Sequence, residues 1–107
     1  MRMLEFKVNG QQLKRKETCD FSKIVKGSVN YLQAKFYFNS TDWDECKKAA
    51  SFWVNGEELA ILLDENDICM IPKEVCDSTV FEISVTGIKP GSDYKIVTAK
   101  TKLRQVS

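Results

Sequence analysis

Two Asn-Gly pairs constrain the fold of this chain more than any other feature. Asn9-Gly10 and Asn55-Gly56 each stand between runs of strand-forming residues. Asn and Gly adopt the positive φ angles of a type I′ turn at little cost, so each pair predicts a β-hairpin. The second pair is the clearer, because residues 51–54 lead into it and residues 59–63 lead out. The chain is therefore predicted to consist of hairpins.

Alternation of apolar and polar residues places the remaining strands. In residues 32–38, Phe36 and Phe38 fall on one face and Lys35 and Tyr37 on the other, as in a half-buried strand. Seven or eight strands are expected, at residues 3–8, 11–14, 32–38, 48–54, 58–63, 68–71, 80–86 and 94–106.

Short turns complete the predicted element order. One helical turn is expected at residues 42–46, and another at residues 73–76, where Pro72 suits the start of a helix. Residues 17–30 are less regular and favour at most one short strand, at residues 23–25.

Many short strands separated by regular turns are typical of an all-β domain. We predict a single domain, residues 1–107, folded as an immunoglobulin-like antiparallel β-sandwich, with a small barrel as the alternative. The predicted core takes the apolar side of each strand and consists of Phe36, Phe38, Phe52, Leu62, Ile71, Phe81, Ile83 and Val85.

The charge balance makes several partners unexpected. The net charge is +1, from 16 basic and 15 acidic residues. Binding to phosphates requires a cationic excess, so nucleic acid is not an expected partner. Basic residues do gather at residues 14–16 and at Lys100, Lys102 and Arg104, where we expect a solvated face or a sheet edge. No apolar run has the length of a membrane span and no signal peptide is present, which predicts cytoplasmic synthesis and no membrane partner.

Histidine is absent from the chain. Its absence removes the commonest general base, the usual partner of a nucleophilic Ser or Cys, and the commonest metal ligand. Nucleotide-binding and hydrolase motifs are absent as well. We therefore predict no enzymatic activity, catalytic residue, cofactor, metal or small-molecule substrate. The alternative is a carboxylate-based hydrolase that uses Asp42, Asp44 or Glu45. We interpret this acidic stretch, and a second at residues 64–67, as solvated loops.

The four cysteines lack the close pairing of a structural zinc site. Cys19, Cys46, Cys69 and Cys76 include no CxxC pair. In a reducing compartment they are expected to be free thiols. Cys69 lies inside an apolar strand and should be at least partly buried, whereas Cys46 follows a charged turn and should be more exposed.

A longer set of residues resembles a known protein family. The set comprises Phe36-x-Phe38, Trp43, Lys48-Ala49-Ala50-Ser51-Phe52, Cys69-x-Ile71-Pro72-x-Glu74-Val75 and Phe81-x-Ile83-Ser84-Val85-x-Gly87. In this order it resembles the N-terminal β-sandwich module of upper baseplate and minor tail proteins from phages and prophages of Gram-positive bacteria. The resemblance covers residues 24–106 and consists of core and turn positions, so it concerns fold and assembly rather than catalysis.

The resemblance implies a structural function. The chain would be a phage or prophage tail or baseplate module that mediates protein–protein assembly, with other phage structural proteins or further copies of itself as partners. It would be made in the host bacterial cytoplasm and then enter the virion. The alternative is a small phage accessory protein that binds and inhibits a host defence or metabolic protein. The basic C-terminal strand and the first hairpin are the expected edges for such contacts, and no individual contact residue is assigned.

Overall fold

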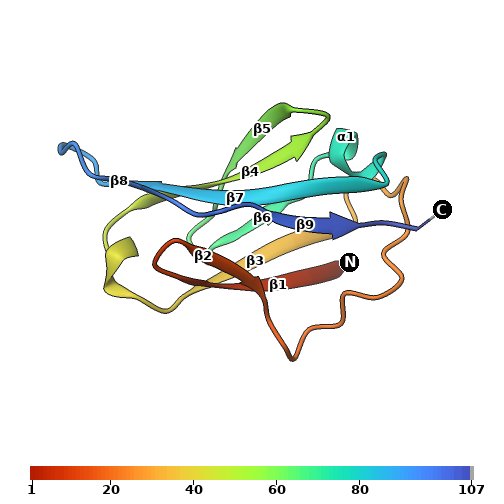
Figure 1. The fold of residues 1–107 in the computed structure, drawn as a ribbon, viewed down its shortest axis with the longest axis horizontal. Helices are drawn as coiled ribbons and strands as arrows, with labels where there is room; N and C mark the ends of the chain where they lie inside the picture. The colour runs from red at the N-terminus through yellow and green to blue at the C-terminus, as the bar shows by residue number, and fades with distance from the viewer. Residues whose placement is uncertain (107) are drawn as a thin grey trace.

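The chain folds into two β-sheets that pack against each other (Figure 1). The computed structural model describes residues 1–106. The first sheet has the strand order β2-β1-β3-β6; the second has the order β5-β4-β7-β8, and β9 also pairs with β7. Within the described residues the strands are β1 (Arg2–Asn9), β2 (Gln12–Arg15), β3 (Leu32–Phe38), β4 (Lys47–Val54), β5 (Glu57–Leu62), β6 (Ile68–Met70), β7 (Val80–Ile88), β8 (Lys95–Val97) and β9 (Thr101–Arg104).

Both predicted hairpins form, but their turns differ. In the β4–β5 hairpin Asn55 and Gly56 have φ angles of 51° and 81°, as a type I′ turn requires. In the β1–β2 hairpin Asn9 still pairs with Gln12, so the turn residues are Gly10 and Gln11. The predicted position of the first turn is therefore wrong by one residue. Ser40 Oγ accepts a hydrogen bond from the Gly10 N–H at 2.9 Å and holds the turn in this place.

The first sheet is mixed, and the prediction of a purely antiparallel fold is wrong. β1 and β3 run parallel, with Phe6 opposite Phe36. β2 returns the chain antiparallel to β1, and residues 16–31 then carry it back to begin β3 opposite Arg2. A parallel pair needs such a long connection, because a tight turn can join only antiparallel strands.

The core lies between the two sheets and confirms most of its predicted members. Phe36, Phe52, Ile71, Phe81, Ile83 and Val85 are buried, and Phe38 is half-buried against them. The prediction for Leu62 is wrong, because its side chain is 73% exposed. Leu59 and Ile61 lie opposite Phe52 and Ala50 and take the inward positions of β5. Strand alternation then turns Leu62 to the outer face.

The remaining elements match the predictions in part. The helical turns form as η1 (Thr41–Trp43) and α1 (Lys73–Cys76). At the predicted strand 23–25 the structure shows one isolated bridge, between Val25 and Val106. The long final strand is wrong: it divides into β8 and β9. Thr86 of β7 lies opposite Val97, but Ile83 of β7 lies opposite Thr101. The segment that joins β8 to β9 therefore has one residue more than the part of β7 it faces, as in a β-bulge.

The Trp43 side chain connects three parts of the fold. It is 2% exposed, and its Nε1 donates a hydrogen bond to the Gly10 carbonyl at 2.9 Å. Its ring packs 5.0 Å from the Phe38 ring, measured between centroids. Gly87 of β7 faces the same indole: a Cβ atom at this position would lie 2.7 Å from it. The indole thus links the first hairpin, the end of β3 and the end of β7 in the second sheet.

The buried Phe36 ring provides a test of the core. Replacing it with Ala should lower the free energy of unfolding by about 3–5 kcal/mol, because a cavity replaces a fully packed ring. Urea denaturation measures the change. The control is Val29→Ala at a half-exposed position, which should change stability by less than about 0.5 kcal/mol. Equal effects of the two substitutions would contradict the assigned core.

Gly87 provides a test of the Trp43 contact. Gly87→Ala should destabilise the protein by about 1–3 kcal/mol, because the new methyl group would overlap the indole. In a Trp43→Leu background the same substitution should cost much less, since leucine lacks the ring atoms that the methyl group meets. A double-mutant cycle followed by urea denaturation measures this coupling. Additive effects would show that the two residues do not meet.

Candidate interaction surfaces

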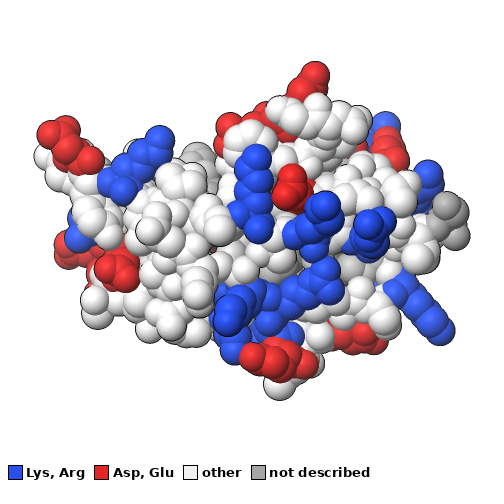
Figure 2. Space-filling model, in the orientation of Figure 1, with Lys and Arg blue, Asp and Glu red and all other residues white. Residues whose placement is uncertain are grey.

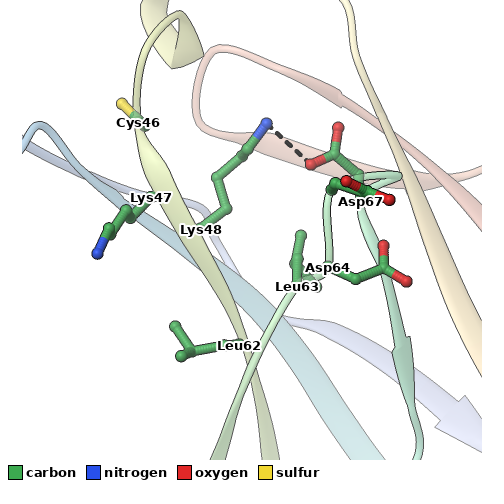
Figure 3. A pocket seen from close by; sticks show the side chains of 8 residues that line it. Cys46, Lys47, Lys48, Leu62, Leu63, Asp64 and Asp67 are labelled. Atoms are coloured by element: carbon green, nitrogen blue, oxygen red, sulfur yellow. Dashed lines mark ion pairs between the residues drawn. The ribbon is translucent and has the colours of Figure 1, made fainter.

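The two acidic loops lie side by side in the structure. Asp44 and Glu45 follow η1, and Asp67 lies between β5 and β6, yet all three line one open depression. A neighbouring depression of about 410 Å³ is lined from the same loops and is drawn in Figure 3. There Lys48 points at Asp67, with Nζ 2.9 Å from Oδ1. A lysine therefore neutralises part of the charge that gathers between the loops.

Other contacts of these carboxylates belong to the fold. Asp64 Oδ1 accepts hydrogen bonds from the N–H groups of Asn66 and Ile68, at 2.8 and 3.0 Å, and so closes its own loop. Such Asx-type bonds are a usual function of Asp in turns. The side chains of the hydrolase alternative, Asp42, Asp44 and Glu45, are all exposed. A carboxylate-based hydrolase uses two carboxyl groups in different environments, so that one acts as the acid and the other as the base, and carboxylates that are all exposed share one environment.

No metal centre is assembled by the described residues. Within residues 1–106 no three His, Cys, Asp or Glu side chains are grouped closely enough to hold an ion. No helix in this part of the chain is both long and apolar enough to cross a membrane.

The two basic stretches of the sequence form one surface. β2 and β9 lie against each other: Thr101 Oγ1 donates a hydrogen bond to the Leu13 carbonyl at 2.6 Å, and Arg15 Nη2 donates to the Lys102 carbonyl at 2.8 Å. Figure 2 shows Lys and Arg side chains gathered over this boundary. We call it the basic seam; its exposed cations are Lys14, Arg15, Lys100, Lys102 and Arg104.

One carboxylate lies among the cations of the basic seam, because Glu82 stands opposite Lys102 across β7 and β9. No carboxylate of residues 1–106 forms a salt bridge with any of them. The Lys100 ammonium lies 3.8 Å from the Trp53 ring centroid, and the Arg15 guanidinium lies 5.3 Å from that of Phe21. Aromatic faces attract these cations without cancelling their charge. The seam therefore presents positive charge to solvent.

The neighbouring face of the first sheet differs, because its charges are paired. Tyr37 donates a hydrogen bond to Glu5 Oε2 at 2.5 Å, and Lys16 Nζ lies 3.6 Å from the same oxygen. The Tyr37 hydrogen bond, with the charges of Lys16 and Lys35 nearby, lowers the pKa of Glu5. Lys7 also forms an ion pair with Glu17. This face carries little free charge, so the basic seam is a local feature.

The structure revises which sheet edges are free. β2 ends the first sheet and β9 pairs on one side with β7, as the predicted edges require. These two strands cover each other, however, and the Ala99 N–H donates to the Gln11 carbonyl at 2.9 Å. Within residues 1–106 the other outermost strands are β6 and β8, which have three residues each, and β5, which has six.

The cysteines fall into two classes of exposure. Cys69 and Cys76 are buried, and Cys19 and Cys46 are half-buried; all four are free thiols. The expected burial of Cys69 is confirmed, as is the greater exposure of Cys46. Burial raises the pKa of Cys69 to about 12, with Asp64 adding to the rise, and burial also raises the pKa of Cys76. Neither buried thiol is suited to act as a nucleophile at neutral pH.

No protein-family model matches this chain, and no curated protein matches it either.

The basic seam is the surface that sequence reasoning missed. Its two halves were visible as basic stretches, but they are separated by about 85 residues in the chain (Arg15 to Lys100). In one half the basic residues are consecutive and in the other they alternate with other residues, and both patterns are common on an ordinary solvated strand. Only the packing of β2 against β9 brings the two halves together. No local signal could have revealed their union.

The exposure classes of the thiols predict their order of reaction. At pH 8 iodoacetamide should modify Cys19 and Cys46 before Cys69 and Cys76, because burial excludes the reagent and disfavours the thiolate. Mass spectrometry of peptides from native protein measures the order. As the control, unfolded and unreduced protein should gain four alkyl groups. Two groups or none would show a disulfide, and fast reaction of Cys69 would contradict its burial.

Proposed function

We propose that this chain is a structural module of a phage or prophage tail or baseplate, which joins other subunits through the surface of an immunoglobulin-like β-sandwich. The resemblance in the core and turn residues supports this proposal. The two-sheet fold, with Phe36, Trp43 and Gly87 packed in its core, agrees with a family pattern made of core positions. Exposed surfaces rather than a pocket are then the working parts.

The basic seam is the observation that carries the proposal. Cations from the two ends of the sequence meet there without salt-bridge partners among the described residues. A surface with an excess of positive charge steers association toward a complementary negative one and selects against like-charged partners. The partner would be an acidic surface on another tail or baseplate protein.

One residue of the seam favours a protein partner over nucleic acid. Glu82 lies opposite Lys102 across β7 and β9, and so places a carboxylate within the basic surface. A continuous row of phosphates would be repelled at this point, whereas a protein surface with mixed charges can be complementary to it. The near-zero net charge of the chain agrees with this choice.

Reversing charge on the seam should weaken assembly. Lys102→Glu with Arg104→Glu should lower affinity by on the order of ten-fold, since two attractive contacts become repulsive. The measurement is capture of tail and baseplate proteins from disrupted phage particles on the immobilised chain, with mass spectrometry of what binds. The control, Lys26→Glu with Lys95→Glu, makes the same charge change at two exposed lysines outside the seam and should retain capture.

Three results would contradict the proposal. The first is absence of the protein from purified particles together with capture of a host enzyme, which would favour the accessory-inhibitor alternative. The second is equal capture by the seam variant and the control. The third is salt-sensitive binding of a thymidine oligonucleotide that the seam variant loses, which would make the seam a nucleic-acid surface.

A further inference from the structure

The β5 strand is an open edge without the usual protection. It is the outermost strand of the second sheet and pairs only with β4. Its sequence, Glu-Glu-Leu-Ala-Ile-Leu, contains no lysine or proline, and its two charged residues stand together at the turn end. Proteins normally shield an edge with such residues, or with a bulge or a covering element. β5 pairs with β4 without interruption over all six of its residues, so no bulge twists it away.

The ladder with β4 determines which backbone groups of β5 are free. The Leu63 N–H donates a hydrogen bond to the Lys48 carbonyl at 2.9 Å, so the backbone groups of residue 63 point toward β4. Antiparallel strands alternate strictly between bonded and non-bonded pairs. Residues 57, 59 and 61 therefore bond to β4, while the N–H and C=O groups of Glu58, Ala60 and Leu62 point away from the sheet. Among residues 1–106 no other backbone group bonds to them.

The side chains leave this edge accessible. Leu62 is 73% exposed on the outer face of the sheet, and Figure 3 shows it pointing to the same side as Lys47. Ala60 has only a methyl group. Glu58 is drawn back over β4, where its Oε2 accepts a hydrogen bond from Ser51 Oγ at 2.5 Å. Its carboxylate therefore does not screen the free backbone groups.

We propose that β5 binds β5 of a second copy of this chain, antiparallel, across a two-fold axis at Ala60. The free groups of Ala60 would bond to those of the partner's Ala60. Glu58 would lie opposite the partner's Leu62, and Leu62 opposite the partner's Glu58. The second sheets of the two copies, five strands each, would become one continuous sheet.

The register argues for a second copy as the occupant. With the axis at Ala60 every residue from 57 to 63 has a partner, and no glutamate faces a glutamate. An axis at Glu58 would set two like charges directly opposite, which is destabilising. An axis at Leu62 would set Ala60 opposite the partner's Asp64 and leave Glu57 and Glu58 outside the strand pair. Among axes placed at a residue whose backbone groups are free, only Ala60 pairs residues 57–63 with one another and sets no glutamate opposite a carboxylate, as suits a two-fold interface.

Charge on the outer face supports the same arrangement. Lys47 is exposed, and no carboxylate of residues 1–106 forms a salt bridge with it. In the proposed dimer the partner's Glu58 would enter this face next to Leu62, on the side where Lys47 lies. To reach Lys47, this Glu58 carboxylate would exchange its hydrogen bond with Ser51 of its own chain for an ion pair across the interface. One strand pair is a small interface, so the dimer would be of the weak class whose population depends on concentration.

Disulfide trapping tests the register. In a Cys19→Ser, Cys46→Ser background, Ala60→Cys should form a covalent dimer in oxidised glutathione, because Cα atoms of a hydrogen-bonded antiparallel pair lie about 5.5 Å apart. The control, Lys102→Cys on the basic seam, should form several-fold less. Glu58→Cys and Leu62→Cys should cross-link poorly alone and well when mixed. Cross-linking no faster than the control, or equal in every mixture, would overturn the proposal.

A second variant tests the uncross-linked protein. Ala60→Pro removes only an N–H that faces away from β4, so the fold should persist with a similar melting temperature. Sedimentation equilibrium should show a concentration-dependent dimer for the native chain and a monomer for this variant. A native chain that stays monomeric at all concentrations would refute the dimer. This inference deepens the proposed assembly function, but it is tested on the purified chain alone, so its failure would leave the seam proposal standing.

Discussion

The fold depends on how one tryptophan is held between the two sheets. Trp43 comes from the short η1 turn, yet it bonds to the Gly10 carbonyl and packs against Phe38. The absence of a side chain at Gly87 leaves space for the indole over β7. A large buried aromatic with a satisfied N–H contributes both burial and orientation. Through this contact the first hairpin, the mixed sheet and the second sheet are joined to one another.

The parallel pairing of β1 and β3 has the next largest consequence. It requires a long connection, residues 16–31, and leaves the short arm β2 at the border of the first sheet. There β2 meets β9, and a few hydrogen bonds close this side of the molecule. The closure gathers the cations into the basic seam and leaves the opposite side open at β5. The molecule thus has one charged, covered side and one side where the outer edge of the mainly apolar β5 is free, which suits two different kinds of contact.

Much of the architecture was predictable because local signals agreed with tertiary packing. The Asn55-Gly56 turn, the alternation around Phe36 and the helical turn after Pro72 depend on neighbours in the chain. Leu62 was mispredicted although a local signal existed. Residues 59–63 are all apolar, so alternation of polarity gives no sign of which side chains point inward. The two-residue turn, however, sets Leu59 opposite Phe52. Because successive side chains of a strand point to opposite faces, Leu62, three residues further on, points outward. The parallel strand and the split between β8 and β9 had no such signal, since both arise from contacts between distant segments.

The sequence by itself determined the strands, their turns and most of the core, because period-two alternation and positive-φ turn residues act over a few residues. It also determined that the chain has no histidine and a net charge near zero. Only the tertiary structure decided which strands became edges and which charges became neighbours. Strand order depends on pairings between distant segments, such as β1 with β3 across the connection 16–31, and these cannot be read from any short segment. The basic seam and the open β5 edge are therefore properties of the packed sheets, although every residue in them was visible from the start.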